Sequence, residues 1–112
     1  MGHHDETSDL LRGTLDLLIL KSLARGRMHG YGIAQFVHAA SEQVLLVGDS
    51  SLYPALQRLL LRGWVRAEWG VSENNRRARY YTLSAAGRKH LDSERRAIER
   101  VMLAIQNVLR AT

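Results

Sequence analysis

The sequence predicts a mostly α-helical fold with one small β-hairpin. Apolar residues recur at helical spacing in four separate stretches. Between the third and fourth stretches, residues 64–69 and 79–83 alternate like two strands and flank a polar run at residues 74–77. The expected order is therefore α-α-α-β-β-α, with a polar-faced helix directly before a basic hairpin tip. This order is typical of a winged helix-turn-helix, whose third helix can enter a DNA major groove while the hairpin lies along the phosphates.

The composition is that of one folded domain without disulfides. The chain has 112 residues, of which 46% are hydrophobic and 24% charged, and it has no cysteine. The lack of cysteine excludes disulfides, thiolate metal sites and a cysteine nucleophile. Because the sequence holds neither a signal-peptide pattern nor an apolar run of about 20 residues, we expect a cytoplasmic protein without a membrane partner.

Positive charge is concentrated in the second half of the chain. Residues 1–56 carry four Lys/Arg and six Asp/Glu, a net of −2, whereas residues 57–112 carry twelve and five, a net of +7. A basic half that begins inside the third predicted helix fits a polyanionic partner. A cationic surface that only keeps the protein in solution would explain the charge equally well.

The first helix is expected to begin at Ser8 or Asp9, after a flexible tail at residues 1–8, and to end near Ala24. Its apolar residues cover more than half of its circumference, so the helix needs partners on two sides. A second subunit can supply one of them, and complete burial within the chain's own core is the less favoured alternative. The residues of this helix that we expect at a dimer interface are Leu10 and Leu17.

The second helix is expected over residues 31–41, after a turn at residues 28–32. Ile33, Phe36, Val37 and Ala40 recur at helical spacing and should face the core. Residues 44–47 follow as an apolar link or a small strand.

The third helix is expected over residues 51–62, with Ser50 or Ser51 as its N-cap and Gly63 directly after its end. Pro54 should then lie in the first turn, where its missing N–H costs little. The stripe expected to be buried is Leu52, Ala55, Leu56 and Leu59. Away from this stripe, the helix presents hydroxyl, phenol, amide and guanidinium groups, which suit phosphates and base edges. Its candidate DNA-binding residues are Ser50, Ser51, Tyr53, Gln57 and Arg58.

The predicted turn at residues 70–77 is rich in groups that bind phosphate. Arginine can bind a phosphate through two N–H groups or enter a narrow minor groove, and asparagine tolerates the left-handed backbone of a tight turn. The alternatives are a tip that is charged only for solubility, and an ion pair between Arg79 and Glu68 across the hairpin. The candidate DNA-binding residues here are Asn74, Asn75, Arg76, Arg77 and Arg79.

The last helix is expected from its N-cap Ser84 to about Arg110. Its apolar residues form a coiled-coil-like stripe, which is typical of an oligomerisation arm. We therefore divide the chain into a DNA-binding domain at residues 9–84 and a dimerisation helix at residues 85–112. The residues of this helix expected at the dimer interface are Leu91, Ile98, Val101, Met102, Ile105, Val108 and Leu109.

The remaining reactive or aromatic residues form no catalytic or metal-binding pattern. His29, His38 and His90 are scattered along the chain and lack the spacing of metal ligands. We therefore expect no enzyme activity, no metal and no cofactor. Trp64 and Trp69 are expected to anchor the hairpin to its own core, in preference to lining a ligand pocket.

Five segments together give the chain a specific resemblance to PadR-type transcriptional regulators. The segments are residues 11–16 (LRGTLD), 28–34 (MHGYGIA), 51–56 (SLYPAL), 63–65 (GWV) and 73–81 (ENNRRARYY). The resemblance implies a compact homodimeric repressor whose first and last helices build the dimer. It also implies that Tyr31, Ser51, Tyr53 and the arginines of the hairpin lie at DNA.

The resemblance also makes a small aromatic effector a candidate partner. Some compact members of the family bind flat aromatic drugs between tryptophans of the last helix. This chain departs from that pattern, because residues 91–112 contain no aromatic side chain.

We therefore predict a homodimeric, sequence-specific repressor that is relieved by a small molecule. It should read a pseudo-palindromic operator in double-stranded DNA with two third helices set about 34 Å apart. Tyr53 and Ser51 should contact the DNA backbone, and Gln57 and Arg58 should read bases. The alternative from another class is a winged-helix protein-interaction module that binds no DNA, for which Leu60, Leu61 and Val71 would supply an apolar patch.

Overall fold

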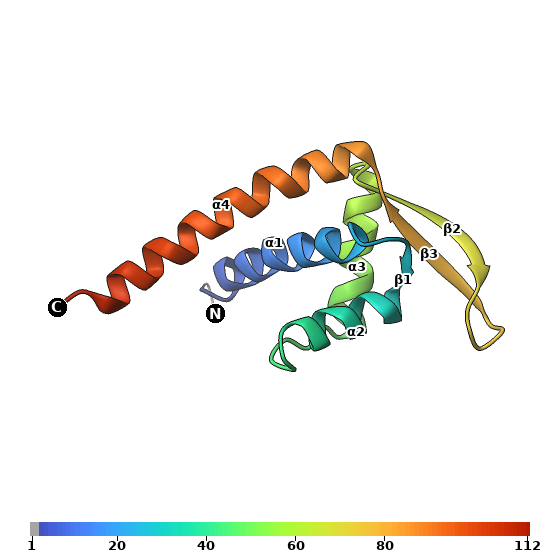
Figure 1. Cartoon of the computed structure of the whole chain (residues 1–112), viewed down its shortest axis with the longest axis horizontal. Helices are drawn as coiled ribbons and strands as arrows, with labels where there is room; N and C mark the ends of the chain where they lie inside the picture. The colour runs from blue at the N-terminus through green and yellow to red at the C-terminus, as the bar shows by residue number, and fades with distance from the viewer. Residues whose placement is uncertain (1–2) are drawn as a thin grey trace.

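The computed structural model describes the chain from His3 to Thr112, and its side chains from Gly13 onward. Within these residues, four helices and a three-stranded antiparallel sheet confirm the predicted mostly helical class (Figure 1). The elements are α1 (His3–Leu23), β1 (Met28–His29), α2 (Gly30–Ala40), α3 (Asp49–Leu61), β2 (Val65–Val71), β3 (Arg77–Leu83) and α4 (Ala85–Arg110).

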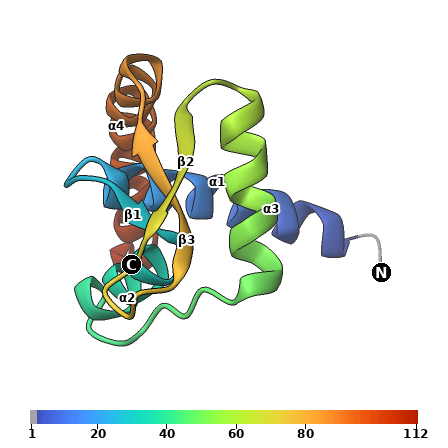
Figure 2. The ribbon, with the colours of Figure 1, turned by 90° about the vertical axis from the view of Figure 1, so that its right-hand side faces the viewer.

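The core lies where α1, α2 and α3 meet the sheet and the first turns of α4, with α3 beside β2 (Figure 2). The predicted apolar face of α3 is buried as expected, and that of α2 is buried or partly buried except at Ala40, which is exposed. The buried hydrophobic residues are Ile19, Leu20, Leu23, Ile33, Val37, Leu52, Ala55, Leu56, Leu59, Val65, Tyr81 and Leu91.

The start of α1 differs from the prediction. The helix begins at His3, not at Ser8 or Asp9, so the predicted tail at residues 1–8 overlaps it. Residues 1–2 lie outside the described part of the chain. The observed α1 is therefore longer at its N-terminal end than the helix predicted from the capping residues.

The start of α3 also differs. Gly48 is the N-cap and Asp49 the first helical residue, so the prediction that Ser50 or Ser51 caps the helix is wrong. As a result Pro54 lies beyond the first turn, where it has no N–H to donate to the carbonyl of Ser50. The preceding segment at residues 44–47 forms no strand, contrary to one of the two expectations.

The end of α3 is as predicted. Gly63 has φ +75°, and Trp64 donates its N–H to the carbonyl of Leu59 at 3.0 Å while Gly63 donates to Leu60 at 3.0 Å. This pair of hydrogen bonds is the Schellman arrangement, in which a residue with positive φ directly follows the helix.

The hairpin is longer than predicted. Pairing continues to Gly70 with Ala78 and to Val71 with Arg77, so the connecting turn shrinks to residues 72–76. At this turn Asn75 takes the left-handed φ of 58°, as expected of asparagine in a tight turn. The short strand β1, which was not predicted, pairs with β3 and brings the start of α2 beside the hairpin.

A tight junction joins α4 to the rest of the fold. The predicted N-cap is confirmed, because the Ser84 hydroxyl accepts from the N–H of Gly87 at 3.0 Å, and it donates to the carbonyl of Gly63 at 2.6 Å. From this junction α4 runs back past α1, and its C-terminal half continues beyond the rest of the fold (Figure 1). With α4 included, the chain measures 57 × 30 × 28 Å. No helix in the described part of the chain is long and apolar enough to span a membrane.

Candidate nucleic-acid interface

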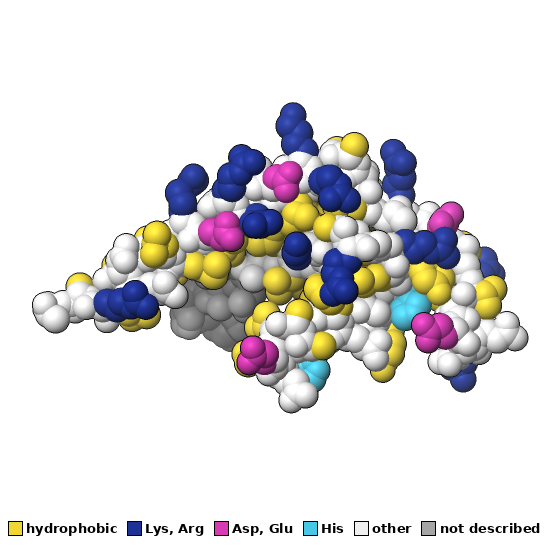
Figure 3. Space-filling view, viewed as in Figure 1, with side chains coloured by type: hydrophobic (Ala, Val, Ile, Leu, Met, Phe, Trp, Pro, Cys, Tyr) yellow, Lys and Arg dark blue, Asp and Glu magenta, His cyan; other side chains and the backbone are white. Residues whose placement is uncertain are grey.

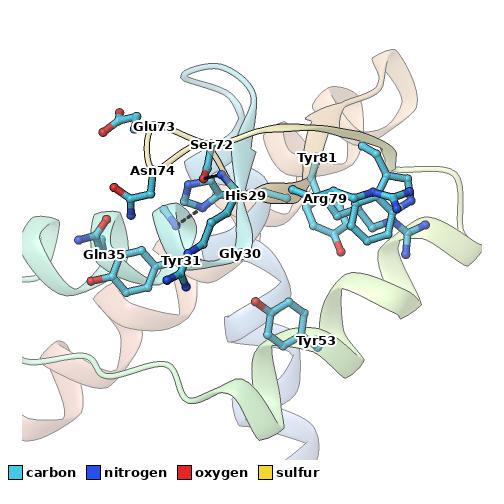
Figure 4. Close-up of a pocket in the computed structure, with 15 residues that line it drawn as sticks. His29, Gly30, Tyr31, Gln35, Tyr53, Ser72, Glu73, Asn74, Arg79 and Tyr81 are labelled. Carbon is cyan, nitrogen blue, oxygen red and sulfur yellow. Dashed lines mark hydrogen bonds between the residues drawn. The ribbon is translucent and has the colours of Figure 1, made fainter.

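A groove of about 810 Å³ lies between the hairpin, the start of α2 and α3 (Figure 4). We call β2, β3 and the connecting residues 72–76 the wing, and this hollow the wing groove. Aromatic, basic and amide side chains from three separate segments line it. Among the lining residues are Tyr31, Gln35, Tyr53, Trp69, Asn74, Arg76, Arg77, Arg79 and Tyr81.

Tyr53 is the part of α3 that reaches the wing groove. Its side chain is 47% exposed, and its hydroxyl lies so close to Gly30 that a Cβ there would come within 2.7 Å of the oxygen. The pKa of Tyr53 is raised, first by partial burial and then by the nearby Asp49 carboxylate. The phenol therefore stays neutral at physiological pH and can donate a hydrogen bond to an anion.

The start of α2 forms the floor of the groove. His29 caps this helix, since its Nδ1 accepts the N–H of Gly32 at 3.0 Å. The imidazole also lies against two tyrosine rings, with centroids 6.3 Å from Tyr31 and 5.4 Å from Tyr80. Tyr31 itself lines the groove and is 67% exposed, so its phenol is accessible to a partner.

The wing supplies the positive charge. Arg76, Arg77 and Arg79 all line the groove, and two of them lie over aromatic rings. The guanidinium of Arg77 is 4.4 Å from the centre of the Trp69 ring, and that of Arg79 is 5.9 Å from Tyr81. Three guanidiniums beside two exposed tyrosines form a surface suited to the phosphates of a nucleic acid backbone.

The structure brings together six of the predicted DNA-binding residues and leaves five outside the wing groove. The six are Tyr31, Tyr53, Asn74, Arg76, Arg77 and Arg79. Of the other five, Ser50, Ser51 and Gln57 are exposed on α3, and Asn75 is exposed at the turn. These four remain open to solvent, so they are accessible to a partner that lies along α3 and the wing.

Arg58 has a different environment. It donates from Nη2 to Asp16 Oδ1 of α1 at 2.8 Å, and the two side chains are 30% and 18% exposed. Arg58 therefore lies on the side of α3 that faces α1, whereas Tyr53 lies on the side that faces the wing. The geometry gives Arg58 a partner within the fold and does not place it with the other candidate base readers.

Two expectations about the hairpin need correction. Glu68 pairs with Arg27 at 2.8 Å, so the predicted alternative of an Arg79–Glu68 pair is not found. Trp64 packs against the core and stacks on His90 with centroids 3.6 Å apart, as expected of an anchor. Trp69, however, is 59% exposed and lines the wing groove, because β2 continues past the edge of the core.

Sequence reasoning also missed His29 and Gln35 as groove residues. Helical spacing does place Gln35 on the same side of α2 as Tyr31, one turn later, but Gln35 was not among the candidate DNA-binding residues. His29 gave no comparable signal, since its role as a cap depends on the observed start of α2.

The predicted dimer residues divide into two groups. Leu17 and Leu91 pack in the core of their own chain, and Leu10 lies outside the residues whose side chains are described. Ile98 is partly exposed. The apolar residues farther along α4 are at least half exposed, namely Val101, Met102, Ile105, Val108 and Leu109. Lys and Arg side chains project from the outer side of α4, and hydrophobic ones lie between α4 and α1 (Figure 3).

Among the described residues, no group of three or more His, Cys, Asp or Glu is placed to hold a metal ion.

Comparison with known proteins gives one family. Residues 19–93 match the profile of the transcriptional regulator PadR-like family. A transcriptional regulator from Clostridium thermocellum has a similar structure, with a TM-score of 0.78 and 26% identity over 88% of this chain and 96% of that one. PadR of Bacillus subtilis, solved in complex with operator DNA, has a TM-score of 0.64 and 25% identity over 71% of this chain and 45% of that one.

A relative known from its sequence is an uncharacterized 37.1 kDa protein of a Streptomyces fradiae transposon. It is 39% identical over 87 residues, which make up 76% of this chain and 23% of that protein. The chain thus spans less than a quarter of that relative's length.

Proposed function

Because the chain belongs to the PadR-like family of transcriptional regulators, we propose that it acts by binding double-stranded DNA through α3 and the wing groove. The observation that carries this proposal is the convergence of Arg76, Arg77 and Arg79 with Tyr31 and Tyr53 on one open groove. Guanidinium and phenol groups donate hydrogen bonds to phosphate oxygens, and arginine does so through two N–H groups. The likeness to B. subtilis PadR, whose structure contains operator DNA, supports the same assignment.

In this proposal α3 lies in the major groove and reads the sequence. Ser50 and Gln57 are both exposed on α3, Ser50 before Tyr53 in the sequence and Gln57 after it. A glutamine amide can pair with an adenine edge through two hydrogen bonds, so Gln57 is the base reader that the exposed side of α3 supports best. Because Arg58 has a partner in Asp16, we assign it a structural role instead.

We further propose that the protein acts as a homodimer. The exposed stripe of α4 supports this, because the side chains of Val101, Met102 and Ile105 are each about half exposed in the single chain. A second copy of α4 would cover this surface. Repression, and its relief by a small molecule, are proposed from the family resemblance alone, because they do not follow from any of the contacts described above.

A protein-interaction module is the competing proposal. Leu61 and Val71 are 80% and 65% exposed, which favours it, whereas Leu60 packs against the core. These two side chains lie at opposite ends of the predicted patch, one at the end of α3 and one near the hairpin turn. They therefore form no continuous apolar surface for a protein partner, whereas the basic side chains of the wing groove lie together.

Selection from a pool of random DNA duplexes tests the function directly. We expect the purified chain to enrich a two-fold symmetric motif with half-sites about 34 Å apart, as two α3 helices on one face of the DNA require. A Gln57→Ala variant should enrich a motif that is degenerate at defined positions and otherwise the same. Failure of the unaltered chain to enrich any sequence, at any salt concentration, would favour the protein-interaction module.

A further inference from the structure

Trp69 is an exposed tryptophan on the wing that does not pack against the hydrophobic core. The residue lies on β2 opposite Arg79 and is 59% exposed, and it is not among the residues packed against the core. The other tryptophan of the chain, Trp64, is partly buried and stacked on His90. The indole of Trp69 is therefore accessible to a partner that enters the wing groove.

Arg77 lies against the Trp69 ring. Its guanidinium is 4.4 Å from the ring centre, and both side chains line the wing groove. In the register of the hairpin Arg77 faces Val71, so Trp69 is its diagonal neighbour on the adjacent strand. This diagonal placement allows the flat guanidinium to rest on the face of the indole.

Such a stack leaves the hydrogen-bonding edge of arginine free. A guanidinium that lies flat on an aromatic ring contacts it through its face, so its N–H groups, which lie in the plane, can still bind a phosphate through two hydrogen bonds. A long arginine side chain otherwise loses rotamer freedom when it binds. A ring that already restricts the side chain reduces this loss.

We propose that Trp69 is a positioning residue of the DNA interface. It holds Arg77 over the wing groove, and the nucleic acid backbone covers its exposed indole when DNA binds. This inference rests on the proposed function, because it assumes that the groove takes up DNA.

A double-mutant cycle measures the coupling between the two residues. The variants are Trp69→Leu, Arg77→Ala and their combination, each titrated at low salt with a labelled duplex from upstream of the protein's own coding sequence. We expect Trp69→Leu to weaken binding roughly threefold to tenfold, and to add little once Arg77 is already alanine. Trp69→Phe keeps an aromatic face and should retain most of the affinity. Leu103→Ala, which removes an exposed apolar side chain from α4 and leaves the wing unchanged, is the control and should bind like the unaltered chain.

Fluorescence gives a second test that does not depend on replacing Trp69. In a Trp64→Phe variant Trp69 is the only tryptophan, and we expect its emission to change on addition of saturating duplex. Binding with unchanged emission, or a Trp69→Leu variant that binds as tightly as the unaltered chain, would overturn the role of Trp69 and leave the proposed function intact. Independent losses at Trp69 and Arg77 would likewise overturn the positioning role. If the unaltered chain binds no duplex at all, the proposed function fails, and the inference with it.

Discussion

Arg58 of α3 donates a hydrogen bond to Asp16 of α1 at 2.8 Å, and the pair joins the candidate recognition helix to the first helix. Both side chains are partly buried, with exposed fractions of 30% and 18%. The Arg58 Nε, which is buried, has no hydrogen-bond partner among the described residues. The guanidinium therefore depends on the Asp16 carboxylate, and the pair helps to fix the position of α3 against α1.

Replacing Asp16 should destabilise the protein. Asp16→Ala leaves a partly buried guanidinium without its carboxylate, and we expect a loss of about 1–3 kcal/mol in the free energy of unfolding. Urea denaturation followed by circular dichroism measures it. The matched control is Glu99→Ala, which breaks an exposed pair with Arg95 on α4 at 3.7 Å and should cost about 0.5 kcal/mol or less. Equal losses in the two variants would contradict the importance of the α1–α3 pair.

Gly87→Ala tests the junction between α4 and the hairpin. A Cβ at this position would lie 2.0 Å from the carbonyl oxygen of Trp64, which is backbone and cannot move aside without disturbing β2. We expect a loss of roughly 1–3 kcal/mol, measured by thermal or urea unfolding. Gly13→Ala on α1 is the control, because a Cβ there meets nothing within 4 Å and should be neutral or stabilising by up to about 1 kcal/mol. A fully stable Gly87→Ala variant would contradict the close approach.

The wing arginines should contribute the salt-dependent part of binding. Arg76→Ala combined with Arg77→Ala should weaken binding to every duplex. It should also flatten the plot of log affinity against log salt, by about 0.9 for each phosphate that the variant no longer neutralises. Arg96→Ala with Arg100→Ala removes the same charge from exposed positions on α4 and serves as the control. An unchanged slope in the wing variant would exclude these arginines from the DNA backbone interface.

The exposed stripe of α4 should hold the dimer together. Ile98→Asp with Ile105→Asp places unpaired charges on that stripe, and we expect monomers in sedimentation velocity. Asn107→Asp adds charge on the opposite side of α4 and should leave the dimer intact. A double variant that still sediments as a dimer would place the interface elsewhere.

The four helices and the hairpin were predictable from periodicity because each is long enough to repeat its pattern. β1 was not, since a strand of two residues has no period, and its pairing with Tyr80 and Tyr81 depends on the tertiary fold. The N-cap of α3 was also predicted wrongly. Two serines fit the general preference for an N-cap, but the helix extends past them to Gly48.

The candidate site was only partly predictable for a related reason. Helical spacing places Tyr53 and Arg58 outside the buried stripe, but it does not say which flank meets α1 and which meets the wing. Alternation likewise predicts the face of β2 on which Trp69 lies, but not that β2 extends beyond the core and leaves the indole exposed. Both distinctions arise from packing between distant segments.

Fluorescence anisotropy with two labelled duplexes tests the central claim most directly. One duplex comes from upstream of the protein's own coding sequence, the other is a scrambled version, and both are titrated across a salt series. We predict tight binding of two chains per upstream duplex, a clear preference over the scrambled one, and affinity that falls with salt. No binding to either duplex at low salt would contradict the assignment of the wing groove and α3 to DNA.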